Sequence, residues 1–253
     1  MLSVLAIDLD DTLIRSDQTV SARTLDLLAA WVDAGHRAVI ATGRPPRATR
    51  AIPDALHALP WICYNGGVIL DAGQTIHRAN LTAAATASFV DAFVDAAPDA
   101  WIGLEVDDEL YLSRRDSPYS ETVMVDDLRT VAHQPACKII VALDSYRRVA
   151  SRLGPLPHGI RAQLSEKYNL AQIMPTGVSK SAALHLLVER WGLDMAHVVA
   201  FGDDTNDLEM IQDAGMGVAM ANAVPELKAV ANRVTLSNDE DGVAVVVAEL
   251  LAA

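Results

Sequence analysis

The chain contains few cysteines and few aromatic residues. Among its 253 residues are two cysteines, and aromatic residues make up 5% of the total. Cys63 and Cys137 lie in apolar segments far apart, and neither belongs to a CxxC pair that would indicate a metal site. This pattern favours two small core residues with reduced thiols, and therefore a cytoplasmic protein.

The chain also has few basic residues and no long apolar run. Its formal net charge is −13, from 33 acidic and 20 basic residues, and no basic stripe interrupts this field, so nucleic acid is not an expected partner. The apolar residues 2–7 end abruptly at Asp8 and follow no basic segment, which predicts a buried strand and not a signal peptide. No later run approaches the roughly 20 residues that span a bilayer. The composition is typical of a soluble globular protein with no membrane partner.

Strands and helices alternate in the first third and again near the C-terminus. Strands are predicted at residues 4–9, 37–41, 61–64 and 197–201, with short ones at 217–220 and 234–236. Ser21 caps a helix whose predicted apolar face is Leu25, Leu28, Ala29 and Val32, and further helices are predicted after Pro45 and at residues 179–191. Strands separated by helices of this length indicate an α/β fold with a parallel sheet. Residues 83–174 instead combine hairpins with two helices, which predicts an inserted α+β domain.

Asp8-Leu9-Asp10-Asp11-Thr12 follows the first predicted strand. Two aspartates at positions i and i+2 of an extended chain point to the same side, toward the crevice where parallel sheets bind ligands. One carboxylate can attack phosphorus while the second protonates the leaving oxygen. A polar strand exit gives the same letters by chance. A calcium loop is excluded, because Leu13 stands where that loop requires glycine and Thr19 where it requires glutamate.

Two further segments have the composition of an anion site. Thr42-Gly43-Arg44 follows the second strand and offers a hydroxyl, backbone N–H groups and a glycine that permits close approach; a plain helix cap is the alternative. Lys180 stands at the predicted start of a helix, where a lysine is unfavourable unless an anion compensates it. An ordinary exposed lysine is the alternative here.

Gly202-Asp203-Asp204-Thr205-Asn206-Asp207 is the strongest of the four segments. Three aspartates and one asparagine crowd together directly after an apolar strand, and such like charges repel one another unless a cation neutralises them. Magnesium suits a site that is shared with phosphate. A solvated acidic helix start is the alternative for this segment alone. The combination of all four segments, three of them at strand ends, favours a metal-dependent phosphoryl-transfer site.

These segments resemble, in order, the four motifs of the haloacid dehalogenase superfamily, and specifically its Cof-type branch with a C2B cap. Asn65-Gly66-Gly67, residues 217–223 and residues 238–242 also resemble that branch. The resemblance implies a Rossmann-like core of residues 1–82 and 175–253, with residues 83–174 as the cap. Asp11 stands where many relatives carry glycine, and aspartate is tolerated in that position.

The resemblance also implies a role for each motif residue. Asp8 would be the nucleophile and a Mg²⁺ ligand, while Asp10 would act as general acid and then base and bind the metal through its backbone carbonyl. Thr42, the N–H of Gly43 and Lys180 would hold the phosphoryl oxygens. Asp203 would be the third protein ligand, supported by Asn206 and Asp207, while Asp204 receives no role.

The implied activity is Mg²⁺-dependent hydrolysis of a small phosphorylated metabolite, such as a sugar phosphate or a phosphorylated cofactor, through an aspartyl-phosphate on Asp8. A phosphomutase with the same intermediate and a non-catalytic metal-binding scaffold are the alternatives. A dehalogenase is disfavoured by Lys180 and Asp10, and a P-type pump by the lack of membrane spans. Substrate contacts in the cap are not legible; its polar side chains include Arg114, Arg115, His158, Lys167 and Tyr168. The oligomeric state is not predicted.

Overall fold

A computed structural model describes residues 2–114 and 122–253 and divides the chain into two compact units. Unit 1 consists of Met1–His77 and Ser179–Ala253, and unit 2 of Arg78–Val178. The insert predicted at residues 83–174 lies within the bounds of unit 2.

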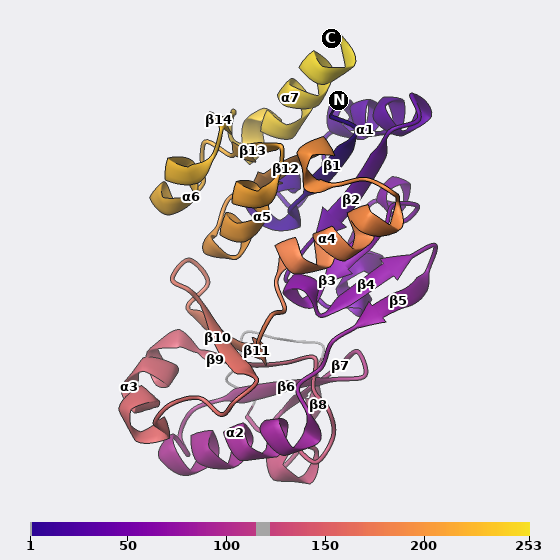
Figure 1. The fold of residues 1–253 in the computed structure, drawn as a ribbon. Coiled ribbons are helices and arrows are strands. Elements are labelled where there is room, and N and C mark those ends of the chain that lie inside the picture. Colours follow the sequence, from indigo (N-terminus) through magenta and orange to yellow (C-terminus); the bar gives the residue numbers. More distant parts are fainter. Residues whose placement is uncertain (1, 115–121) are drawn as a thin grey trace. The chain divides into compact units, whose positions relative to one another are not determined.

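A largely parallel sheet forms the centre of unit 1, in the strand order β14-β13-β12-β1-β2-β3-β4-β5 (Figure 1). The pairs from β14 to β3 are parallel, and β4 runs antiparallel to β3. The strands are β1 (Val4–Ile7), β2 (Arg37–Ala41), β3 (Trp61–Cys63), β4 (Val68–Asp71), β5 (Gln74–Arg78), β12 (Val198–Gly202), β13 (Met216–Ala219) and β14 (Arg233–Val234). This arrangement confirms the predicted α/β class.

Two groups of helices pack on this sheet. Helix α1 (Ala22–Asp33) contacts α7 (Gly242–Leu251), while α5 (Leu208–Asp213) lies between α4 (Lys180–Arg190) and α6 (Pro225–Val230). The residues of β1 and β12 are buried throughout, as expected for parallel strands covered on both faces. Their carboxyl ends meet at one edge, since Ile7 pairs with Ile40 of β2 and with Phe201 of β12.

The predicted apolar face of α1 was wrong. The helix buries Thr24, Leu28 and Trp31, whereas Val32 is 41% exposed. Trp31 belongs to the interior because its large ring is covered there and its indole N–H donates to the carbonyl of Arg37 at 2.8 Å. The predicted face and the observed face share only Leu28.

The prediction of a helix after Pro45 was also wrong, because residues 46–56 do not form one α-helix. The chain instead makes short 3₁₀ turns at Pro46–Ala51 and Asp54–Leu56, separated by Pro53. Pro45 and Pro46 carry no backbone N–H, so a helix here would lack two of the donors that a helix start offers to an anion. The N–H of Thr42 donates to the carbonyl of Ile62 and that of Arg44 to the Thr42 hydroxyl, so the anion seat predicted at this loop reduces to the Thr42 hydroxyl and the N–H of Gly43.

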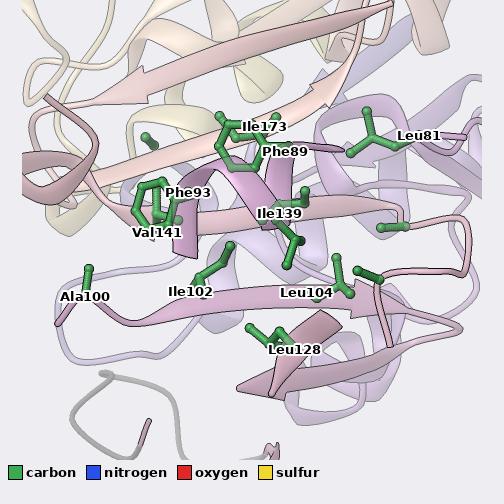
Figure 2. Packing of buried hydrophobic residues seen from close by; sticks show 14 of the residues in the cluster. Leu81, Phe89, Phe93, Ala100, Ile102, Leu104, Leu128, Ile139, Val141 and Ile173 are labelled. Atoms are coloured by element: carbon green, nitrogen blue, oxygen red, sulfur yellow. The ribbon is translucent and has the colours of Figure 1, made fainter. Parts of the chain in front are cut away.

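A second, six-stranded sheet organises unit 2, in the order β10-β11-β9-β6-β7-β8. The strands are β6 (Ile102–Val106), β7 (Glu109–Leu112), β8 (Val123–Met124), β9 (Lys138–Ala142), β10 (Ile160–Ser165) and β11 (Leu170–Pro175). Helices α2 (Ala83–Ala96) and α3 (Leu143–Leu153) pack together and bury a core that includes Phe89, Phe93, Leu104, Ile139 and Ile173 (Figure 2). Neighbouring strands are antiparallel except β7 and β8, which gives the α+β texture that the sequence predicts.

Across residues 2–114 and 122–253, every helix is too short or too polar to cross a membrane.

Candidate active site

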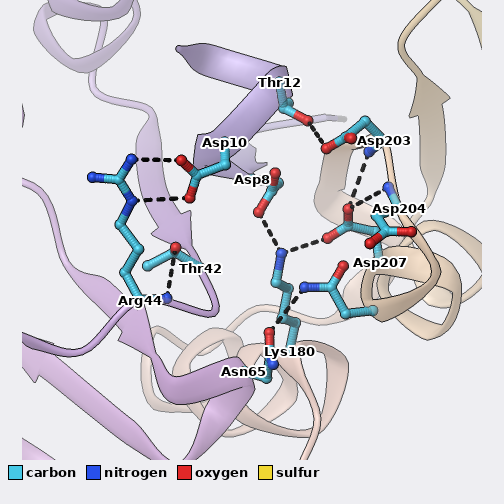
Figure 3. A network of polar contacts seen from close by, with 11 residues as sticks. Asp8, Asp10, Thr12, Thr42, Arg44, Asn65, Lys180, Asp203, Asp204 and Asp207 are labelled. Carbon is cyan, nitrogen blue, oxygen red and sulfur yellow. Dashed lines mark hydrogen bonds and ion pairs between the residues drawn. The ribbon is translucent and has the colours of Figure 1, made fainter. Parts of the chain in front are cut away.

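Buried charges meet at the carboxyl ends of β1 and β12. Asp8 follows β1 directly and its backbone N–H donates to the carbonyl of Phe201 at 3.0 Å, which ties it to the end of β12. Asp203 follows β12, and both residues are at most 5% exposed. The sequence-predicted neighbours at positions 8 and 203 are thus brought to the same edge of the sheet (Figure 3).

Lys180 lies at the centre of this cluster. It is the first residue of α4, and its fully buried ammonium group donates to Asp8 and, at 2.7 Å, to Asp207. Ser179 caps the helix by accepting from the N–H of Ala182 at 3.2 Å. A lysine at the positive end of a helix is stabilised here by the two carboxylates that face it.

Asp207 closes the loop that follows β12. One of its oxygens accepts from Lys180, and the other accepts from the N–H groups of Asp203 and Asp204 at 3.0 and 3.2 Å. Gly202 permits this arrangement, because a side chain there would come within 2.5 Å of the Asp207 Cβ. Asp207 is fully buried and both of its oxygens are used inside the protein.

The charge balance of the cluster is negative. Burial raises the pKa of Asp8 well above its ordinary value, and Asp207 and Asp203 act in the same direction, while Lys180 opposes them. Burial by itself lowers the pKa of Lys180, but Asp207 and Asp8 outweigh it and raise the net pKa. The buried carboxylates of Asp8, Asp203 and Asp207 thus lie in one cluster, in which Lys180 forms ion pairs with Asp8 and Asp207.

The cluster fits a hard divalent cation. One ligand oxygen from each of Asp8, Asp203 and Asp207 lies within 4.8 Å of the others. Carboxylate oxygens are the ligands that Mg²⁺ prefers, and a cation would offset the surplus negative charge. Since the oxygens of Asp207 are already engaged, Asp8 and Asp203 are the carboxylates best suited to hold the ion.

Asp10 points to a different partner from Asp8. Asp10 lies in the tight turn Leu9–Leu13. Arg44 donates two hydrogen bonds to its carboxylate, one from Nε at 2.9 Å and one from Nη2 at 2.5 Å. Both side chains are partly exposed, in contrast to Asp8. Asp11, in the same turn, has a left-handed backbone with φ +57°, and its carbonyl accepts from Asn222 at 2.7 Å.

The Thr42 loop lies next to these residues. Thr42 is fully buried, and its hydroxyl accepts from the N–H of Arg44 at 3.0 Å. A side chain at Gly43 would lie 3.1 Å from the Asn65 amide oxygen, so this position is tightly packed. Asn206, the remaining predicted residue, donates to the same amide oxygen of Asn65 at 2.9 Å.

Several residues that make contacts at the site received no functional role from the sequence. Thr12 donates to Asp203 at 3.0 Å and thereby links the first and fourth motifs. The roles of Arg44, Asn65 and Asn222 were likewise missed. Thr12 and Arg44 lie within motifs that the sequence analysis names, and this membership alone could have indicated that they belong to the site.

Four of the five polar residues that the sequence analysis names in the insert lie in the described part of the chain. Arg114, His158, Lys167 and Tyr168 belong to unit 2, and the Lys167 ammonium lies 5.5 Å from the ring centroid of Tyr168. Arg115 lies outside the described residues.

The chain belongs to the haloacid dehalogenase-like hydrolase family, whose model matches residues 5–247. This confirms the resemblance inferred from the four motifs and the prediction that the protein is a hydrolase. The solved structures that it resembles include a haloacid dehalogenase-like hydrolase from Bacteroides thetaiotaomicron, with a TM-score of 0.85 and 28% identity, covering 99% of this chain and 100% of that one.

Two similar proteins of Bacillus subtilis (strain 168) are named 5-amino-6-(5-phospho-D-ribitylamino)uracil phosphatases. YitU is 28% identical over 95% of this chain and 94% of its own length. YwtE is 30% identical over 99% of both chains. The likeness therefore extends over both units and is not confined to the motifs.

Proposed function

We propose that the protein is a Mg²⁺-dependent phosphatase that hydrolyses a small phosphorylated metabolite through an aspartyl-phosphate on Asp8. The observation that carries this proposal is the convergence of Asp8, Lys180, Asp203 and Asp207 in one buried cluster with surplus negative charge. The names of the relatives, which are phosphatases of a phosphorylated small molecule, support it.

In this mechanism Asp8 and Asp10 take part in bond formation and proton transfer, and the other motif residues bind the substrate or the cation. Asp8 attacks phosphorus, and Asp10 protonates the oxygen that leaves and later takes a proton from the water that hydrolyses the aspartyl-phosphate. Thr42, the N–H of Gly43 and Lys180 hold the phosphoryl oxygens. Asp8, Asp203 and the backbone carbonyl of Asp10 would hold Mg²⁺, which supplies charge neutralisation when it is bound.

The other predicted features have supporting roles. Asp207 orients Lys180 by its 2.7 Å hydrogen bond, and Asn206 connects the same loop to Asn65. Arg44 fixes the direction in which the Asp10 carboxylate points. We further propose that unit 2, with residues 83–174 as its predicted extent, is the cap that supplies substrate contacts.

The proposed substrate is a sugar phosphate or a phosphorylated cofactor. The net charge of −13 argues against nucleic acid as a partner, and we infer no membrane partner. Both cysteines are buried thiols, which fits the reducing cytoplasm that we infer as the location.

Release of phosphate from an aryl phosphate and from a panel of phosphorylated metabolites, with Mg²⁺ or with a chelator, tests the proposal. The panel should include hexose phosphates and 5-amino-6-(5-phospho-D-ribitylamino)uracil. We expect release that requires Mg²⁺ and is abolished in Asp8→Asn. Near wild-type turnover of that variant would refute the nucleophile. Isomer formation from a hexose phosphate without stoichiometric phosphate would indicate a mutase instead.

A further inference from the structure

The segment Tyr64–Gly66, which follows β3, has an unusual backbone. Three consecutive residues have positive φ, with values of +54° for Tyr64, +54° for Asn65 and +105° for Gly66. Left-handed geometry is routine for glycine and tolerated by asparagine, but a bulky residue such as tyrosine adopts it rarely. Such backbone persists where surrounding contacts over-determine it, and it clusters at functional sites.

Two main-chain bonds connect this turn to the Thr42 loop. The N–H of Asn65 donates to the carbonyl of Thr42, and the N–H of Tyr64 donates to that of Arg44, both at 2.9 Å. The Asn65 side chain also lies against Gly43, whose Cβ position would be 3.1 Å from the amide oxygen. The turn therefore fixes the loop that provides two of the proposed phosphate contacts.

The same turn contacts the two other loops of the site. A Cβ at Gly66 would lie 2.1 Å from the carbonyl oxygen of Ser179, so the turn packs directly on the residue that precedes Lys180. The amide oxygen of Asn65 accepts from Asn206 at 2.9 Å, in the loop after β12. Asn65 is 1% exposed.

We infer that Asn65 is a positioning residue of the phosphate site. Its left-handed backbone and its amide connect the Thr42 loop to the Asn206 loop. The neighbouring Gly66 packs the same turn on the start of α4. A variant can remove the hydrogen bond between the Asn65 side chain and Asn206 without altering the backbone. This inference rests on the proposed phosphatase function, because it concerns the same site.

Asn65→Gly is the variant that separates these contributions. Glycine adopts the left-handed backbone without strain, so the fold is retained while the amide is lost. We expect a melting temperature lowered by roughly 2–6 °C, because one buried hydrogen bond is lost. We also expect a roughly tenfold weaker affinity for inorganic phosphate in the presence of Mg²⁺ and a roughly tenfold lower kcat. The concentration of Mg²⁺ that half-activates the enzyme should not change, since Asn65 contacts neither Asp8 nor Asp203 in the interactions described above.

Asn169→Gly is the matched control. Asn169 is also a left-handed asparagine, with φ +47°, but it lies in unit 2 between β10 and β11. Its replacement should leave the affinity for inorganic phosphate unchanged. Equal losses in the two variants would overturn the inference, because the effect would then belong to the replacement of any such asparagine.

A double-mutant cycle with Asn206→Ala tests the route of the effect. If Asn65 acts through its bond to Asn206, the double variant should bind inorganic phosphate no more weakly than the weaker single variant. Losses that multiply would overturn this route. A wild-type enzyme that releases phosphate from no ester would refute the proposed function, whereas an active wild type that Asn65→Gly matches would refute only the inference about Asn65.

Discussion

Asp207→Asn provides a direct test of the buried cluster. Asp207 is fully buried and accepts three hydrogen bonds, one from Lys180 and two from the N–H groups of Asp203 and Asp204. The amide oxygen of asparagine can keep the two backbone bonds, but its NH₂ group then faces the ammonium of Lys180. The variant therefore loses one charge-assisted bond and leaves a buried cation with Asp8 as its remaining carboxylate.

The magnitude follows from these contacts. Removing one partner of a buried pair costs about 3–5 kcal/mol, and the retained bond to Asp8 places this case at the lower end, about 3 kcal/mol. For a chain of this size each kcal/mol lowers the melting temperature by about 2–4 °C, so we expect a decrease of roughly 6–12 °C. Thermal unfolding followed by circular dichroism, in a chelator so that no divalent cation compensates, measures it.

Asp213→Asn is the control for this experiment. Asp213 ends helix α5 and accepts from Ser181 at 2.5 Å, but its side chain is 46% exposed, so water can replace the lost interaction. We expect a loss below about 1 kcal/mol. If Asp207→Asn melts within about 2 °C of this control, the buried pair contributes no more than a surface one and the electrostatic reasoning is wrong.

Two further predictions concern a glycine and a thiol. Gly66→Ala should destabilise the protein far more than Gly73→Ala, as measured by urea unfolding. Both glycines have positive φ, but only at Gly66 would the added Cβ lie 2.1 Å from the Ser179 carbonyl oxygen. Equal losses of stability in the two variants would contradict this steric clash. Burial raises the pKa of Cys137 from 9.0 to about 11, so its contribution to stability is present below pH 9 and is lost as the pH rises toward 11. Between about pH 8 and 10.5 the wild type should lose about 2 kcal/mol more than Cys137→Ala, and parallel pH curves would exclude this effect.

The elements around the site could be predicted because their signals are local. Apolar runs that end in clustered acidic residues mark the ends of β1 and β12, and the positive end of a helix made an isolated lysine at position 180 conspicuous. The parallel topology then requires these ends to meet. Asp8, Lys180 and Asp203 were therefore accessible from residue type and order.

The errors have a different physical origin. Helix α1 carries two candidate apolar stripes that cross at Leu28, and spacing alone does not distinguish them. The burial of Trp31 determines which face of α1 packs inward, because its indole N–H donates to the carbonyl of Arg37 beyond the end of the helix. Similarly, Arg44 pairs with Asp10 across 34 positions and Asn206 with Asn65 across 141, and no local pattern indicates such partners.

Strand register links the fold to the chemistry. Ile7 pairs with Phe201 in the parallel ladder, so Asp8 lies beside Gly202, the last residue of β12, and Asp203 follows one residue later. Successive side chains of a strand point to opposite faces, so a slip of one residue between β1 and β12 would exchange the faces of every side chain on the slipped strand. Burial of Val4, Leu5, Val198 and Val199 resists such a slip along both faces of the sheet. The apolar core thus fixes the distance between two carboxylates that would otherwise repel each other, and a cation between them is the stable complement to that geometry.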